Sequence, residues 1–436
     1  MHAMRIPLAA LLAGALAACA ATPAPRAADP VLSAVVDVPQ VRHPDGETPA
    51  WWFRKGAAQA ASRSAMQGRA RNVILFVGDG MSLATVTAAR ILDGQRKGGP
   101  GESNLLSWED FPSTAFSHTY NTDSQTPDSA GTMSAMATGV KTRAGVISVD
   151  QRPRRGECDP AAARLTLWEL AESAGMATGV VSTARATHAT PGATFAHAAS
   201  RGWENDARMP AAAREAGCTD IARQMIETPF GDGPEVLLGG GRANFLPSTM
   251  ADPEYPEQTG RRADGRNLVD AWLARRPGGT YAWNEAQFRA APVDAPRLGL
   301  FDPAHMHYQH DRGTDPGGEP SLVEMTRTAI AHLSRAPRGY VLLVESARID
   351  HGHHEGNAFR ALDETIALSE AVAVARAMTS EEDTLILVTA DHSHTMTFAG
   401  YPVRGNPILG LVAEEDRDGK VAPALDRDGL PYPPLG

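Results

Sequence analysis

The feature that most constrains the fold of this 436-residue chain is the segment 340–354, with the sequence YVLLVESARIDHGHH. Its first half is a run of β-branched and leucine residues that ends in a carboxylate, Glu345. Such a run predicts a strand that is buried on both faces and has polar side chains only at its carboxyl end. Because α/β sheets bind their ligands at the carboxyl ends of the strands, we expect a functional site here.

Two metal-ligand side chains follow this strand. Asp350 and His354 are four residues apart, which places a carboxylate and an imidazole on the same side of a turn. Oxygen and nitrogen ligands together suit zinc, whereas carboxylates alone suit magnesium. A polar loop after a strand would contain similar residues, so this segment alone leaves both interpretations open.

The rest of the chain alternates between strand and helix patterns. Further strands are expected at residues 72–77, 177–182, 236–241 and 384–390, and helices at 82–95, 165–175, 321–335 and 359–378. This alternation predicts an α/β fold with a mostly parallel central sheet flanked by helices on both faces. Residues 250–320 are polar and rich in Pro and Gly, and we expect them to form a long surface insertion.

Polar residues also stand at three other places where a strand or loop ends. Asp79 lies between two glycines after the strand 72–77, and Asp391 and His392 follow the strand 384–390. Ser129 begins a helix of small residues, where backbone N–H groups and the helix dipole favour an anion. Serine at such a position is usually an N-cap; a metal that lowers the pKa of its hydroxyl would make it a nucleophile.

Composition limits the class of partner. The chain is 42% hydrophobic and 21% charged with a net charge of −10, which is typical of a globular protein. We expect no nucleic-acid partner, because no basic patch is visible. The length would allow two or three average domains, but large α/β enzymes often use it for one sheet with insertions.

The first residues predict export. Residues 1–18 combine a short basic start with an apolar run too short to span a bilayer, which is typical of a signal sequence. Leu16-Ala17-Ala18-Cys19 resembles a bacterial lipobox, so we expect a periplasmic or outer-membrane protein that is lipid-anchored at Cys19; ordinary signal cleavage is the alternative. Residues 19–48 would be a flexible tether. In an oxidising compartment, Cys158 and Cys218 are expected to pair.

Six motifs in a fixed order connect these observations. They are VGDGM at 77–81, PDSAG at 127–131, HATP at 188–191, AHAASR ending at Arg201, VESARIDHGHH at 344–354 and TADHSH at 389–394. With them, the chain from about residue 49 to its end resembles an alkaline phosphatase. It is more similar to the animal-type branch, because His188 and His351 stand where the best-known enterobacterial branch has Asp and Lys.

The resemblance implies hydrolysis of phosphate monoesters of broad range through a phosphoserine, with two zinc ions, one magnesium ion and a homodimer. Ser129 would be the nucleophile and Arg201 the phosphate clamp. The implied metal ligands are Asp79, Asp391 and His392 for one zinc; Asp350 and His354 for the second; and Asp79, Thr190 and Glu345 for magnesium, with His188 beside it. A calcium site in the insertion would use Glu254, Asp302 and Glu319.

One departure from the family pattern concerns the second zinc. The family takes a third protein ligand from a histidine well beyond the DHSH motif, and this sequence has no histidine after His394. We therefore expect a C-terminally incomplete catalytic domain, spanning 49–436, or a weakened enzyme. The alternatives are a metal- or phosphate-binding lipoprotein with little activity and a sister phosphodiesterase or sulfatase activity, although PDSAG is not the CxPxR-like setting of a sulfatase.

Overall fold

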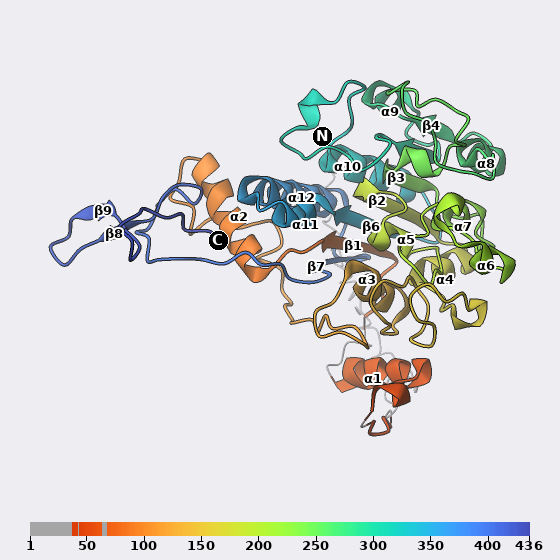
Figure 1. Ribbon diagram of the computed structural model, residues 1–436, viewed down its shortest axis with the longest axis horizontal. Helices are drawn as coiled ribbons and strands as arrows, with labels where there is room; N and C mark the ends of the chain where they lie inside the picture. The colour runs from red at the N-terminus through yellow and green to blue at the C-terminus, as the bar shows by residue number, and fades with distance from the viewer. Residues whose placement is uncertain (1–36, 42, 63–67) are drawn as a thin grey trace, which may run out of the picture.

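The computed structural model describes residues 37–41, 43–62 and 68–436 (Figure 1). The predicted export signal at residues 1–18, Cys19 and the tether up to residue 36 lie outside the described residues. Among the helices that are described, none combines the length and apolar character needed to cross a membrane.

A seven-stranded parallel sheet forms the centre of the molecule and confirms the predicted fold class. Its strand order is β4-β5-β3-β2-β6-β1-β7, and every neighbouring pair is parallel. The bounds are β1 (Asn72–Gly78), β2 (Ala177–Arg185), β3 (Val236–Gly240), β4 (Thr280–Ala282), β5 (Arg297–Leu300), β6 (Tyr340–Ser346) and β7 (Thr384–Ala390). All five strands expected from the sequence are therefore in this sheet.

Helices cover both faces of the sheet because its central strands are apolar on both faces. In β6, Val341 and Leu343 pack into one hydrophobic core, and Leu342 and Val344 pack into the other. The first core contains side chains of α3 (Ser129–Thr138), α4 (Leu167–Ser173), α7 (Ile221–Glu227) and α8 (Leu268–Arg275). The second contains those of α9 (Glu285–Ala290), α10 (Leu322–Leu333) and α12 (Ala358–Met378) (Figure 1).

Local capping sets where several helices begin. Ser82 accepts a hydrogen bond from the backbone N–H of Thr85 and starts α2 (Leu83–Arg96). Ser321 and Glu324 form a reciprocal capping box at the start of α10. The remaining α-helices are α1 (Pro49–Ser62), α5 (Ala189–Gly192), α6 (Ala211–Glu215) and α11 (Arg348–His354).

The structure corrects the expectation that residues 250–320 form only a surface insertion. β4 and β5 lie within this range and extend the sheet, and all four residues of β5 are buried. The sequence pattern missed β5 because the strand is short and begins with a charged residue. The two terminal nitrogens of the Arg297 guanidinium donate to the backbone carbonyls of Phe288, Ala291 and Pro292, whereas its buried Nε has no partner.

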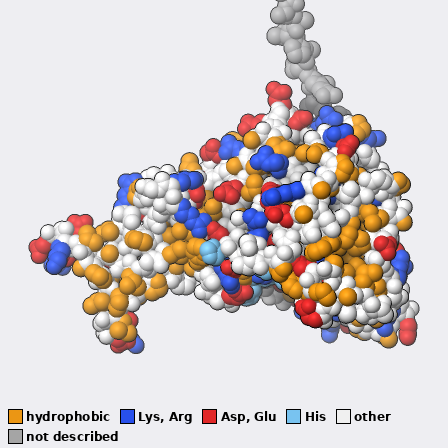
Figure 2. Space-filling view, turned by 90° about the horizontal axis from the view of Figure 1, so that it is seen from above, with side chains coloured by type: hydrophobic (Ala, Val, Ile, Leu, Met, Phe, Trp, Pro, Cys, Tyr) orange, Lys and Arg blue, Asp and Glu red, His pale blue; other side chains and the backbone are white. Residues whose placement is uncertain are grey.

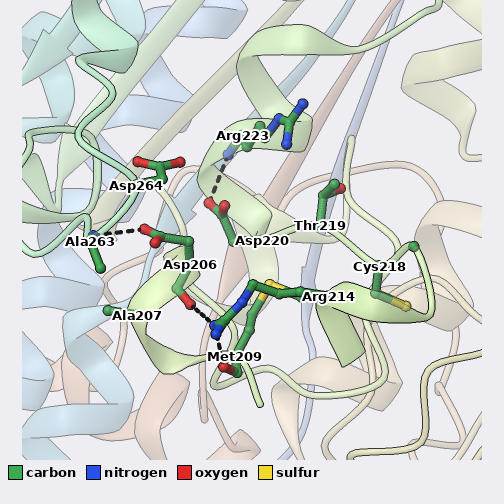
Figure 3. Close-up of a pocket in the computed structure, with 11 residues that line it drawn as sticks. Asp206, Ala207, Met209, Arg214, Cys218, Thr219, Asp220, Arg223, Ala263 and Asp264 are labelled. Carbon is green, nitrogen blue, oxygen red and sulfur yellow. Dashed lines mark hydrogen bonds between the residues drawn. The ribbon is translucent and has the colours of Figure 1, made fainter. Parts of the chain in front are cut away.

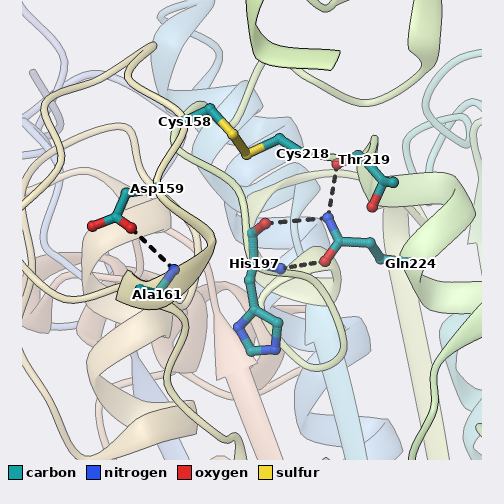
Figure 4. Close-up of a disulfide and its surroundings, with 7 residues drawn as sticks. All are labelled: Cys158, Asp159, Ala161, His197, Cys218, Thr219 and Gln224. Atoms are coloured by element: carbon teal, nitrogen blue, oxygen red, sulfur yellow. Dashed lines mark hydrogen bonds between the residues drawn. A yellow bond between two sulfur atoms is a disulfide. The ribbon is translucent and has the colours of Figure 1, made fainter. Parts of the chain in front are cut away.

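Two further features lie outside the sheet. Cys158 and Cys218 form a disulfide, as predicted, which ties the loop before α4 to the loop before α7 (Figure 4). The C-terminal residues form an arm that extends from the body and carries the hairpin β8 (Ala413–Glu415) and β9 (Val421–Pro423) (Figure 1). Hydrophobic side chains gather along this arm (Figure 2), and Tyr401, Leu425 and Leu430 are more than half exposed.

Candidate active site

The predicted site residues converge at one edge of the sheet. The carboxyl ends of β1, β2, β6 and β7 meet there, because neighbouring strands in a parallel sheet end on the same side. A cavity of about 570 Å³ opens at this edge and is lined by, among others, Ser129, His188, Arg201, Asp350, His354 and His392. Side chains that are far apart in the sequence therefore line the same cavity.

Glycine 80 makes the close approach at the end of β1 possible. Gly80 has a φ of +66°, and a Cβ on it would lie 2.9 Å from Oδ1 of Asp350. Any larger residue would be strained and would displace the carboxylate of Asp350. The turn brings Asp79, which is fully buried, next to Asp350 and Asp391.

Ser129 is not the N-cap of its helix. Asp128 takes that position and accepts a hydrogen bond from the backbone N–H of Gly131 at 3.1 Å, so the hydroxyl of Ser129, the first helical residue, is free. Its Oγ lies 3.3 Å from both carboxylate oxygens of Asp79 and 3.2 Å from Nε2 of His392. The hydroxyl therefore points into the group of charged residues rather than back to its own helix.

The first group of possible metal ligands is Asp79, Asp391 and His392, whose ligand atoms lie within 4.8 Å of one another. Nε2 of His392 is 3.3 Å from Oδ1 of Asp79 and 3.4 Å from Oδ2 of Asp391. The other oxygen of Asp391 accepts hydrogen bonds from the backbone N–H of Gly80 and of His392. These two hydrogen bonds hold the carboxylate in place, and its Oδ2 has no hydrogen-bond partner.

The second group is Asp350, His354 and His394, and the third member was not predicted. Nε2 of His354 lies 3.4 Å from Oδ2 of Asp350, and Nε2 of His394 lies 3.6 Å from Oδ1. Burial lowers the pKa of His394, and its Nδ1 accepts a hydrogen bond from the N–H of Thr395. Nε2 of His394 and Oδ1 of Asp350 are too far apart for a hydrogen bond, so His394 stands beside this carboxylate as a further possible metal ligand. The sequence feature that could have identified His394 is its position two residues after His392.

The third group joins Asp79 to His188 and Glu345. Oε2 of Glu345 accepts a hydrogen bond from Ser182 at 2.5 Å, whereas Oε1 has no partner. Nδ1 of His188 and Oγ1 of Thr190 are likewise buried and without a partner. Buried polar atoms are normally satisfied. Because Arg201 can only donate to Nε2 of His188, the neutral ring carries its proton on Nδ1, and it is the unpartnered oxygens of Glu345 and Thr190 that mark a place for a cation. Thr190 stands beside it as expected.

The electrostatics of the metal-free site are unfavourable. Burial, followed by the charges of Asp391 and Asp350, raises the pKa of Asp79 well above its usual value. Burial likewise raises the pKa of Glu345 to about 7 and that of Asp350 above its ordinary range. Burial and then Arg201 lower the pKa of His188, so its imidazole is neutral. This set of carboxylates and imidazoles fits divalent metal ions.

Arg201 presents its guanidinium to the same cavity. Its Nη1 lies 3.2 Å from Oδ2 of Asp128, and its Nη2 lies 3.1 Å from Nε2 of His188. The side chain is 24% exposed, so the rest of its donors can reach a ligand. A planar fork at this position matches two oxygens of a phosphoryl group.

A second cavity, of about 650 Å³, is larger but carries no such chemistry. It lies beside α6 and α7 (Figure 3), where Asp206 accepts from the N–H of Ala263 and Asp220 from the N–H of Arg223. Buried Arg262 forms ion pairs with Asp220 and Asp264. Its acidic groups are already neutralised, so cavity size does not identify the functional site here.

The three residues expected to bind calcium are not brought together as one set. Asp302 clusters with His307 and Asp315, which were not singled out from the sequence. Glu319 lies at the edge of this cluster, with Oε1 3.7 Å from Nδ1 of His307. Glu254 pairs with Arg242 at 2.8 Å, and it also lies close enough to Asp315 to help raise the pKa of that carboxyl group. Calcium at this place stays a prediction.

The fold and the site together define a class. Ser129 and Arg201 face a cavity at the carboxyl edge of a parallel sheet, next to three groups of metal-ligand side chains that contain carboxylates. Phosphoryl transfer needs positioning and charge neutralisation more than covalent chemistry, and this arrangement supplies both. The class is that of metal-dependent hydrolases of phosphate esters.

Comparisons with known proteins agree with this class. The family model described as alkaline phosphatase matches residues 70–425. The tissue-nonspecific alkaline phosphatase of Gallus gallus is 45% identical over 379 residues, which are 83% of this chain and 72% of that protein. The alkaline phosphatase of Gadus morhua is 45% identical over 374 residues, with 83% and 77% covered. The chain belongs to the alkaline phosphatase family and is a phosphomonoester hydrolase.

Solved structures give the same fold. The alkaline phosphatase of Thermus thermophilus has a TM-score of 0.62 and 28% identity, and the match covers 78% of this chain but only 63% of that one. The enzyme of the Antarctic bacterium TAB5 has a TM-score of 0.59 and 22% identity, with 84% and 90% covered. A magnesium-bound variant of the TAB5 enzyme matches with a TM-score of 0.58 and 22% identity, over 81% of this chain and 84% of that one.

Proposed function

We propose that this chain hydrolyses phosphate monoesters by transferring the phosphoryl group first to Ser129 and then to water. Asp79, Asp391 and His392 hold one zinc ion, and Asp350 and His354 contribute to a second. Asp79, Thr190 and Glu345 hold magnesium, with His188 beside it. When bound, these ions supply positive charge for the phosphoryl group and for the oxygens on either side of it, and they lower the pKa of oxygen nucleophiles.

One observation carries the proposal. Each of the three ligand groups contains a buried carboxylate oxygen without a partner: Oδ2 of Asp391, Oδ1 of Asp350 and Oε1 of Glu345. Leaving a buried charge unpaired costs several kcal/mol, roughly 3 to 5 when one partner of a pair is lost. The hydroxyl of Ser129 lies beside the one residue, Asp79, that two of these groups share.

The protein side chains have distinct roles in the two steps. The Oγ of Ser129 attacks phosphorus while the bond to the alcohol breaks. The hydroxyl proton has a carboxylate oxygen of Asp79 as an acceptor at 3.3 Å, and a proton is taken up by the departing alcohol oxygen. Arg201 holds the phosphoryl oxygens in both steps and is itself held by Asp128. Water then attacks the phosphoserine, the bond to Oγ breaks, and Ser129 is regenerated as phosphate leaves.

A broad substrate range follows from what the cavity lacks. Its lining consists mainly of polar and charged side chains, from Thr126 and Asp128 to Ser393 and Thr395. These side chains bind the phosphoryl end of a substrate. No apolar wall in this lining selects an alcohol, so esters of different alcohols should be hydrolysed at similar rates.

The decisive experiment is hydrolysis of p-nitrophenyl phosphate by the purified chain, before and after treatment with a chelator and after return of zinc and magnesium. We expect the activity to disappear with the metals and to return with them. Metal-independent hydrolysis, or no hydrolysis at any metal content, would contradict the proposal.

We also propose that the protein is exported from the cytoplasm, is anchored by a lipid and forms a homodimer. The signal-like residues 1–18 and the lipobox-like sequence before Cys19 support export and acylation. The disulfide between Cys158 and Cys218 fits an oxidising compartment. The exposed apolar side chains of the arm, such as Tyr401 and Leu430, would be covered in a dimer. Labelling with a radioactive fatty acid and sedimentation of the mature protein test the two parts separately.

A further inference from the structure

Ser148, in the loop between α3 and α4, has an unusual backbone conformation. Its φ is +42°, and among the described residues it is the only one other than glycine with a positive φ. A side chain in this left-handed region is strained, and such strain persists only where the surroundings fix the residue, often at functional sites. Ser148 is completely buried and does not itself line the catalytic cavity.

Every polar group of Ser148 has a partner, and two of its contacts reach helices of the site. Its N–H donates to Oγ of Ser134 on α3 at 2.7 Å, and Ser134 in turn donates to a carbonyl in the first turn of that helix at 2.6 Å. The hydroxyl of Ser148 donates at 2.8 Å to the carbonyl of Ala193, the C-cap of α5, which carries Thr190. Ser148 therefore connects the helix that begins with Ser129 to the helix of an expected magnesium ligand.

The carbonyl of Ser148 is held from another side by His197. Nδ1 of His197 lies 2.8 Å from this oxygen, which can only accept, so Nδ1 carries a proton. Nε2 lies 2.8 Å from Oε1 of Glu169. The side-chain amide of Gln224 accepts from the N–H of His197 and donates to its carbonyl (Figure 4). Because both its ring and its backbone are fixed, His197 can hold Ser148 in the strained conformation.

The same loop also holds Arg201. The carbonyl of Gly145 accepts from the backbone N–H of Arg201 at 2.8 Å, and Ile147 and Ala198 exchange two backbone hydrogen bonds. The N–H of Gly145 donates at 2.9 Å to Oδ2 of Asp128, the oxygen that also accepts from the guanidinium of Arg201. The loop therefore lies between the segment that carries the phosphate clamp and the start of α3.

We propose that Ser148 is a positioning residue for phosphoryl transfer, which sets the place of Ser129 relative to Arg201 by fixing the loop between their segments. The left-handed conformation directs the N–H, the hydroxyl and the carbonyl of one serine to three different partners, which accounts for a strained residue at this position. The inference rests on the roles proposed above for Ser129 and Arg201.

The test separates the hydroxyl of Ser148 from its backbone strain. Ser148→Ala removes the hydroxyl and keeps the strain, whereas Ser148→Gly removes the hydroxyl and adopts a positive φ without strain. We expect kcat/KM for p-nitrophenyl phosphate to fall about 10-fold in both variants, since misplacing a reacting group by about 1 Å can cost about 100-fold. The inhibition constant for inorganic phosphate should rise in both, because the loop also holds Arg201. In urea, the Gly variant should be the more stable of the two.

His197 provides a graded version of the same test. His197→Ala removes the donor to the carbonyl of Ser148, whereas His197→Asn keeps an N–H group near the place of Nδ1 and should recover most of the activity. Ser369→Ala is the matched control, because it also removes a buried serine hydroxyl, one that accepts from the N–H of Ser107 and does not line the cavity. Its kcat/KM and phosphate inhibition should equal those of the unmodified protein.

The outcomes distinguish positioning from a purely structural role. Unchanged kcat/KM and phosphate inhibition in a folded Ser148→Gly variant would overturn the proposal, as would activity that follows stability and is lost only in Ser148→Ala. Metals are counted in every variant by mass spectrometry, and an activity that returns to the unmodified level with added zinc and magnesium would also overturn it. The proposed function fails separately, since the unmodified protein would then hydrolyse no ester.

Discussion

The hydroxyl oxygen of Ser129 lies 3.3 Å from both carboxylate oxygens of Asp79. Ser129 begins α3 and Asp79 follows β1, so the contact depends on how α3 packs at the carboxyl edge of the sheet. Asp79 belongs to two of the three ligand groups, and the contact therefore places the hydroxyl where the charges of both groups meet. This one relationship makes Ser129 the nucleophile in the proposed function.

Replacing Ser129 with Ala should abolish phosphoserine formation and lower kcat by about 10⁴-fold or more, because loss of a nucleophile is among the most costly single changes in an enzyme. Metal content should not change, since Ser129 is not needed to hold the ions. Ser173→Ala, which alters an exposed helix serine, is the matched control. Acid quenching with labelled substrate locates the phosphate; label on another residue would contradict the assignment.

Replacing Arg201 with Lys should lower kcat/KM by about 10- to 100-fold, because an ammonium group cannot make two parallel contacts to phosphate oxygens. Binding of inorganic phosphate should weaken by a similar factor, which competitive inhibition measures. Arg208→Lys changes an arginine that is half exposed and does not line the cavity, and it should be neutral. Unchanged phosphate inhibition in Arg201→Lys would mean that the guanidinium does not bind the phosphoryl group.

Removing the metals should reverse how the stability of the protein depends on pH, so that the metal-free protein becomes less stable as the pH rises. The folded-state pKa of Glu345 is raised by burial from 4.5 to about 7, so between these values the folded protein binds more protons than the unfolded chain. Stability of the metal-free protein therefore falls as pH rises through this window, by about 3 kcal/mol from this residue alone. Asp79 and Asp350 act in the same direction.

Urea unfolding of the chelated protein at pH 5 and pH 8 measures this loss. Zinc and magnesium should restore stability at pH 8 most strongly, because the ligands are then deprotonated. Equal stability of the chelated protein at pH 8 and at pH 5 would mean that deprotonation of the buried carboxylates does not destabilise the folded state.

The structure brings together side chains that the sequence singled out, because these residues occur at the ends of apolar strands. Glu345 and Asp391 could be placed at one edge of a parallel sheet without a structure, since each stands at the end of an apolar run, although β6 is fully buried and the edge strand β7 is only partly buried. The resemblance then distinguished His354 from its neighbour His353, which instead pairs with Thr85 at 2.9 Å. Spacing alone could not separate these two histidines.

The features that the sequence did not predict depend on tertiary contacts. β5 begins with an arginine that only neighbouring backbone carbonyls make acceptable inside the protein. His394 and His307 were not singled out because the carboxylates they meet are distant in the chain or across a loop, and no local pattern encodes such a meeting. The ion pair between Glu254 and Arg242 is likewise a tertiary contact that the sequence did not indicate.

The disulfide should contribute measurably to stability. It closes a loop with a sequence separation of 60 residues, for which loop-closure entropy predicts about 4 kcal/mol. The double variant Cys158→Ala and Cys218→Ala should therefore unfold at lower urea concentration than the oxidised protein, and reductant should affect only the latter. Activity of the folded variant should be retained, because the sulfurs do not line the catalytic cavity. Identical unfolding curves would show that the bond carries no stability.

The last prediction concerns His188 and the affinity for magnesium. Its buried Nδ1 has no partner, its ligand atoms cluster with Asp79 and Glu345, and burial keeps the ring neutral by lowering its pKa. His188→Asp adds a negative charge at this position, so the magnesium site should bind at least about tenfold more tightly, as expected for opposite charges a few ångströms apart. His188→Asn supplies an oxygen without the charge and should give a much smaller gain, which separates charge from ligand type. The Asp variant also loses the contact between His188 and Arg201, so turnover should change as well. Isothermal titration of the zinc-loaded protein with magnesium measures the affinity; equal values for the Asp and Asn variants would mean that His188 does not face the magnesium site.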